Sequence, residues 1–148
     1  MNENIALNKQ IERIKDLVSV AGRPFRGLIV DDEPWVGSVL QGFCEVSPGL
    51  EVDVCFNGLE ALEKLKTTSY DFITVDLVMP ELSGVETVQR ILQIDTHVPI
   101  MIVTGNATEG LKRQAGCAGA RRILEKPVDI TDFMTEVADL LESSAGVT

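Results

Sequence analysis

The chain has 148 residues, and its 45% hydrophobic content suffices for one ordinary core and one domain. Its formal net charge of −10 disfavours direct binding to nucleic acid, and one histidine with three cysteines that lack CxxC spacing excludes a zinc site. Because no apolar run approaches the roughly 20 residues of a bilayer span and no signal peptide is recognisable, we expect a cytoplasmic protein without membrane contact.

Residues 3–20 are predicted to form an amphipathic helix that ends at Gly22 and Pro24. This N-terminal segment carries a net positive charge, whereas the rest of the chain is strongly acidic. Its apolar seam is shorter than two heptads, so two interpretations stay open: the helix docks on its own domain, or it forms a short seam with a partner or a second copy. The seam consists of Leu7, Ile11, Ile14 and Val18.

From residue 25 onwards, strand and helix signals alternate. We predict strands at 27–30, 50–56, 72–76, 99–103 and 122–124, each followed by apolar residues at helical spacing. The last two helices are expected at about 108–115 and 130–141, the latter capped by Asp129 or Thr131. This alternation predicts a parallel sheet with helices on both faces. The expected organisation is an N-terminal helical extension (1–24), a main domain (25–142) and a flexible tail (143–148).

Polar side chains follow four of the five predicted strands. Asp31 and Asp32 come after the first strand, Asp76 after the third, Thr104 after the fourth, and Lys126 after the fifth. Because the carboxyl ends of parallel strands lie at one edge of a sheet, three acids, a hydroxyl and a lysine are expected to share one pocket.

This combination of groups is the one that phosphoryl transfer requires. Three neighbouring carboxylates repel one another unless a cation lies among them, and their oxygens suit Mg²⁺. A lysine and a threonine hydroxyl can meet the phosphoryl oxygens. Asp76, in the apolar run 72–80 that Pro80 terminates, is the candidate nucleophile, as carboxylates are in aspartyl-phosphate chemistry.

The ordered set of residues resembles a receiver domain of the two-component response-regulator family. The resemblance implies a flavodoxin-like (βα)5 doubly wound parallel sheet with strand order 2-1-3-4-5, and the N-terminal helix is additional to it. It also implies a role for each pocket residue. Asp31 and Asp32 would hold Mg²⁺ together with Asp76 and the backbone carbonyl of Val78. Asp76 would accept the phosphoryl group, and Thr104 would be the switch hydroxyl. Lys126, which precedes a proline that is usually cis, would contact the phosphoryl group.

The resemblance further implies a signalling switch rather than an enzyme, one that catalyses only its own phosphotransfer and dephosphorylation. A histidine kinase or phosphotransfer protein would phosphorylate Asp76. A downstream protein or a second copy would then read the state at the face formed by helix 108–115 and strand 122–124. A basic cluster is expected to be solvated surface, and the alternative is that it lies on this face and takes part in partner contacts; it consists of Lys112, Arg113, Arg121 and Arg122.

Two residues depart from the family pattern. Ile123 stands where an aromatic side chain usually swings inward, which removes aromatic gating, and Glu125 beside Lys126 is expected to face away from the pocket. The alternatives are a degenerate receiver that serves as a docking module and a haloacid-dehalogenase-like phosphatase. The phosphatase needs a second acid two positions after its nucleophile, where Val78 stands. A flavodoxin is disfavoured because acids follow the first strand.

Several single residues have simpler interpretations. We expect Cys44, Cys55 and Cys117 to be reduced thiols in the core and His97 to lie on the solvated surface. Trp35 is expected to cover the start of the first helix of the main domain. No output domain is recognisable after Leu141, so the chain either acts through protein contacts or belongs to a longer protein.

Overall fold

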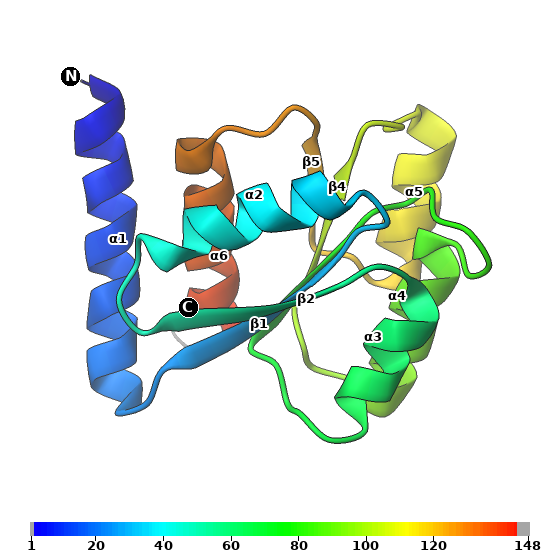
Figure 1. Ribbon diagram of the computed structural model, residues 1–148, viewed down its shortest axis with the longest axis horizontal. Helices are drawn as coiled ribbons and strands as arrows, with labels where there is room; N and C mark the ends of the chain where they lie inside the picture. The colour runs from blue at the N-terminus through cyan, green and yellow to red at the C-terminus, as the bar shows by residue number, and fades with distance from the viewer. Residues whose placement is uncertain (1, 145–148) are drawn as a thin grey trace.

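The computed structural model describes residues 2–144. Five parallel strands form a single sheet in the order β2-β1-β3-β4-β5 (Figure 1). The strands are β1 (Phe25–Val30), β2 (Leu50–Cys55), β3 (Phe72–Val75), β4 (Ile100–Thr104) and β5 (Arg122–Glu125). The helices are α1 (Asn2–Ala21), α2 (Pro34–Glu45), α3 (Gly58–Leu65), α4 (Gly84–Ile94), α5 (Glu109–Ala118) and α6 (Ile130–Ser144). The predicted fold class, strand order and additional N-terminal helix are confirmed.

Helices cover both faces of this sheet and so create two separate cores. α2 and α6 cover one face, and α1 stands beside α6 (Figure 1). Phe72 and Phe133 are fully buried in the core on this side. α3, α4 and α5 cover the other face over Ile73 and Ile102. Every residue of β3 and β4 is buried, which explains why these strands read as continuous apolar runs rather than alternating ones.

The helix starts follow from local capping residues. The side chains of Asn57, Ser83 and Thr108 each accept a hydrogen bond from a backbone N–H in the first turn of α3, α4 and α5, respectively. Asp129 does the same for Asp132 at the start of α6, so it fills the predicted capping position in place of Thr131. α5 continues to Ala118 and ends at Gly119, whose φ of 119° is a left-handed conformation that favours glycine.

Some side chains and ends differ from expectation. Apolar residues at helical spacing were expected to be buried, but Val39 of α2 and Leu59 of α3 are exposed. Trp35, expected to cover the start of α2, is exposed there. Residues 143 and 144, expected in a flexible tail, lie in the last turn of α6. Residues 145–148 of that predicted tail lie outside the described residues.

The N-terminal helix docks on its own domain. Ile14 and Leu17 of α1 are buried in the same core as α2 and α6. Arg13 forms ion pairs of 2.7 Å with both Asp139 and Glu142 of α6. Between the two interpretations of the apolar seam, the structure therefore favours intramolecular packing.

Charged side chains lie along both edges of the sheet. Glu51 and Asp53 of β2 pair with Arg26 of the neighbouring strand at 3.0 and 3.1 Å. At the opposite edge, Arg122 pairs with Glu136 of α6 at 3.2 Å, and Glu125 pairs with Lys112 of α5 at 3.0 Å.

No helix in the described part of the chain is long and apolar enough to cross a membrane.

The three cysteines do not share one environment. Cys44 and Cys55 are buried and free, as predicted, and burial raises the pKa of each thiol to about 12. The prediction for Cys117 was wrong, because this thiol is exposed on α5. α5 has a single buried position, Ala115, so most of its last two turns face solvent.

The docking of α1 predicts a large loss of stability when its buried side chain is truncated. Replacing Ile14, which is fully buried, by Ala should lower the free energy of unfolding by about 2–4 kcal/mol, because it removes methyl groups and leaves a cavity. The matched control Ile5→Ala, at a position that is 68% exposed, should change it by less than about 0.5 kcal/mol. Urea unfolding measures both; equal effects of the two variants would contradict packing of α1 in the core.

The cysteine environments predict selective alkylation. In the native protein at pH 8, iodoacetamide should modify Cys117 alone, since the reactive thiolate must be both accessible and populated. Cys44 and Cys55 should react only after unfolding in denaturant. Peptide mapping by mass spectrometry identifies the modified thiols, and rapid native modification of Cys44 would contradict its burial.

Candidate functional site

The pairing of β1 with β3 brings two distant acids together. Val30 and Val75 are register partners, so Asp31 and Asp76 follow at the same level of the sheet. The Asp76 backbone N–H donates to the Val30 carbonyl at 3.0 Å, which extends the ladder by one residue. The backbone position of Asp76 is therefore fixed by hydrogen bonding of the strands themselves.

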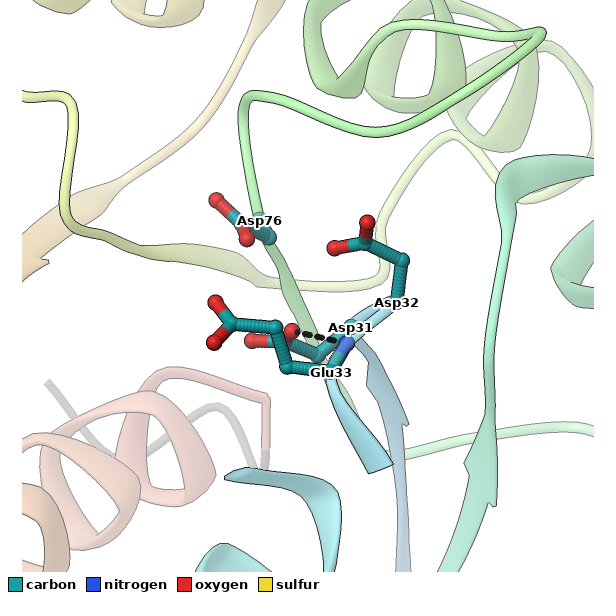
Figure 2. A group of neighbouring side chains, drawn as sticks. All are labelled: Asp31, Asp32, Glu33 and Asp76. Carbon is teal, nitrogen blue, oxygen red and sulfur yellow. Dashed lines mark hydrogen bonds between the residues drawn. The ribbon is translucent and has the colours of Figure 1, made fainter. Parts of the chain in front are cut away.

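Four carboxylates gather at this edge of the sheet. Ligand oxygens of Asp31, Asp32, Glu33 and Asp76 all lie within 4.8 Å of one another. Figure 2 shows the carboxylates of three consecutive residues after β1 and of Asp76 after β3 around a common space. We call these four residues, together with Lys126, the acidic pocket.

Lys126 is the cation of the acidic pocket. Its Nζ lies 2.9 Å from Asp31 Oδ2, 3.2 Å from Asp76 Oδ2 and 3.2 Å from Glu33 Oε1. The Lys126 backbone N–H donates to the Thr104 carbonyl at 2.9 Å, which joins the ends of β4 and β5, and the peptide to Pro127 is cis, as the family resemblance implied.

Burial and mutual charge shift the ionisation of this pocket. Desolvation raises the pKa of Asp31, although Lys126 and the Glu33 backbone N–H act in the opposite direction. Burial alone would lower the pKa of Lys126, but its contacts with Asp31 and Asp76 outweigh that effect and raise it. The lysine is therefore held in its charged form.

Thr104 and Val78 lie at the same edge as the carboxylates. The fully buried Thr104 accepts a hydrogen bond from the Asn106 N–H at 3.2 Å, at the start of the loop to α5. Among the described contacts, none joins its hydroxyl to Asp76 directly. Val78 is an exposed residue two positions after Asp76, and its N–H donates to Asp76 Oδ1 at 3.4 Å.

The residues expected to form a partner face are largely paired within the chain. Lys112 contacts Glu109 and Glu125, so Glu125 turns away from the pocket as predicted. Arg121 donates to Ser143 and to the His97 carbonyl. Arg122 pairs with Glu136 of α6, so Lys112 and Arg122 of the basic cluster have acidic partners, and Arg113 of the same cluster is exposed. Ile123 is half-buried, and His97 is exposed as predicted.

Glu33 is the pocket residue that the sequence reasoning missed. Its carboxylate joins the cluster and contacts Lys126, a role that the prediction of the acid pair did not include. The sequence does place Glu33 directly after Asp31 and Asp32 and before Pro34. At this position, before α2 begins, the chain is still next to the pocket.

The donor set fits a magnesium ion. Carboxylate oxygens are hard ligands of the kind that Mg²⁺ prefers. Apart from its ion pair with Lys126, the buried Asp31 Oδ2 has no hydrogen-bond partner among the described residues, so it retains a free lone pair. Four acids facing one lysine also leave excess negative charge that a divalent cation would offset.

Comparison with known proteins agrees with this site. The family model of the response regulator receiver domain matches residues 28–138. The chemotaxis protein CheY of Treponema pallidum is 32% identical over 124 residues, which are 82% of this chain and 85% of that protein. The transcriptional regulatory protein CpxR homolog of Haemophilus influenzae is 34% identical across 80% of this chain, but the match spans only 51% of that regulator.

Solved structures show the same fold. A CheY-like response regulator receiver domain protein from Methanospirillum hungatei superimposes with a TM-score of 0.80 at 22% identity, covering 84% of this chain and 99% of the other. A putative response regulator from Chloroflexus aurantiacus gives a TM-score of 0.75 at 27% identity, covering 80% and 98%. The chain belongs to the response regulator receiver domain family, with CheY-like architecture. Phosphorylation on an aspartate and a requirement for Mg²⁺ are general features of that family, and the phosphatase alternative is not favoured.

The loop between Asp76 and α4 predicts a strong effect at Gly84. A Cβ on Gly84 would lie 2.2 Å from the Asp76 carbonyl oxygen and 2.5 Å from Leu77 Cα, so both backbones would have to move. Gly84→Ala should cost about 1–3 kcal/mol of unfolding free energy. The control Gly42→Ala, in α2 with open space around its Cβ, should instead stabilise by about 0.5–1 kcal/mol. Thermal unfolding measures both, and a stabilising Gly84→Ala would contradict the close approach.

Proposed function

We propose that Asp76 is the phosphoacceptor of this receiver domain and that the phosphoryl group comes from a phosphohistidine of a histidine kinase or phosphotransfer protein. The observation that carries the proposal is the contact of Lys126 with Asp76 among four clustered carboxylates. The Asp76 oxygen attacks phosphorus, the bond from phosphorus to the imidazole nitrogen breaks, and its electron pair returns to the ring. Lys126 then offsets charge on the phosphoryl oxygens.

Asp31, Asp32 and Asp76 would hold Mg²⁺, with the Val78 backbone carbonyl as a further ligand. The ion would neutralise charge between the carboxylates and the phosphoryl oxygens during transfer. The buried lone pair of Asp31 and the short distances among the acids support this assignment. Asp32, half-exposed at the mouth, leaves part of the coordination shell open to water and substrate.

We infer that Thr104 and Lys126 convert the chemical change into a conformational one. Thr104 is the last residue of β4 and Lys126 directly follows β5, and the backbone hydrogen bond between them couples the two loops that begin there. Moving a two-state equilibrium from 1% to 99% requires about 5.5 kcal/mol. A charge-assisted hydrogen bond contributes about 1.5–3 kcal/mol, so the phosphoryl contacts alone would give a partial bias that a partner completes.

Output would pass through protein contacts on the face formed by α5 and β5, with a downstream protein or a second copy as the partner. A short loop joins Thr104 to α5, and Ile123 of β5 is half-buried against the core on this side of the sheet. The chain spans most of the CheY relative, about half of the CpxR homolog and 28% of a protein-glutamate methylesterase of Treponema denticola. We propose an activity limited to self-phosphorylation and dephosphorylation, without turnover of added phosphomonoesters.

Replacing the acceptor tests the central assignment. Acetyl phosphate with Mg²⁺ should add one phosphoryl group to the wild-type chain, and Asp76→Asn should abolish this addition because the amide is not a nucleophile of comparable strength. Intact mass spectrometry measures the gain. Asp16→Asn, an equal charge change on the exposed surface of α1, should label normally. A phosphorylated Asp76→Asn protein would refute the assignment.

Magnesium binding should be visible through Trp35, the one tryptophan of the chain, which starts α2 close to the acid pair. Its fluorescence should change and saturate as Mg²⁺ is added. Asp32→Asn should raise the midpoint concentration by about tenfold, equivalent to ~1.4 kcal/mol of lost attraction. Glu45→Gln, at the other end of α2, should leave the midpoint unchanged. A flat titration of the folded wild-type protein would count against the metal site.

A further inference from the structure

Glu33 occupies a helix-capping position but does not cap. It is the residue before the first turn of α2, with an extended backbone, and its side chain makes no hydrogen bond to that helix. Its backbone N–H donates to Asp31 Oδ1 at 3.0 Å, which fixes the turn. The carboxylate instead reaches Lys126, far away in the sequence, at 3.2 Å. The Glu33 side chain therefore contacts the pocket lysine instead of capping α2.

The three anions around Lys126 differ in their freedom to move. The side chains of Asp31 and Asp76 are 2% and 6% exposed, whereas that of Glu33 is 46% exposed. The two aspartates follow strands whose backbones are hydrogen-bonded in the sheet. Glu33 is consequently the partner that can leave Lys126 with the least rearrangement, because its carboxylate can exchange the lysine for water.

We propose that Glu33 is a positioning residue that holds Lys126 in the unphosphorylated state and competes with the phosphoryl group for it. This inference rests on the proposed function, since it takes Asp76 as the phosphoacceptor. Phosphorylation places new anionic oxygens on Asp76, beside a carboxylate that already contacts the same ammonium group. Glu33 must release Lys126 before the lysine can turn fully to the phosphoryl oxygens. The resting contact thus favours the unphosphorylated state.

The competition can be measured at equilibrium with beryllium fluoride, a noncovalent analogue of the phosphoryl group, at saturating Mg²⁺. Trp35 fluorescence reports binding. Glu33→Gln removes the competing charge and should bind the analogue about three- to tenfold more tightly than wild type. Glu33→Asp keeps the charge but shortens the side chain, so it should lose the Lys126 contact and also bind more tightly. The control Glu45→Gln, the same charge change on an exposed position of α2, should match wild type.

Each outcome bears on the proposal. Tighter binding by both Glu33 variants supports competition for the lysine. Tighter binding by Glu33→Gln alone reduces the effect to general repulsion and overturns the positioning role, as does wild-type affinity in both. Weaker binding by Glu33→Gln would make Glu33 a supporting ligand and would also overturn it. If the wild-type chain neither binds beryllium fluoride nor accepts a phosphoryl group, the proposed function itself fails, which is a different result. Unfolding curves of each variant establish that it is folded.

Discussion

The pairing of Val30 with Val75 is the constraint on which the pocket depends. It joins two strands that are buried apart from Arg26 and whose next residues are both aspartates, so the free energy of burying apolar strands is what forces like charges together. Mutual repulsion and hydration would separate these carboxylates if the backbone allowed it. Lys126, which directly follows β5, offsets part of the repulsion. Its attraction to Asp31 and Asp76 also raises the pKa of Lys126. The pocket is therefore an unfavourable arrangement that the rest of the sheet maintains.

Much of this arrangement could be predicted from the sequence because each element carries its own local signal. The strands are continuous apolar runs, and the pocket residues follow directly where the runs stop, as with Asp76 after Phe72–Val75. Parallel topology then places all of them at one edge without further information. Helix starts at Asn57, Ser83 and Thr108 follow from capping residues for a similarly local reason.

Other features depend on contacts that no local pattern encodes. The contact of Glu33 with Lys126 requires the direction of the Glu33 side chain, which depends on the turn set by Asp31 and on the position of Lys126, far away in the sequence. The docking of α1 depends on whether α6 offers a complementary face, and Arg13 finds two acids there. Cys117 was misplaced because a cysteine is usually buried, whereas α5 buries only Ala115 and leaves its neighbours in solvent.

The charged edges of the sheet restrict how a second protein can add to this fold. An exposed edge strand normally invites a further strand to hydrogen-bond along it. Here Glu51 and Asp53 line β2, and Arg122 and Glu125 line β5, so an added strand would have to strip water from charges on either side. Recognition by backbone augmentation is disfavoured at both edges. Partners are left with side-chain contacts on the helices, on β5 and on the loops above the strand ends, and the same charges disfavour edge-to-edge aggregation of the fold.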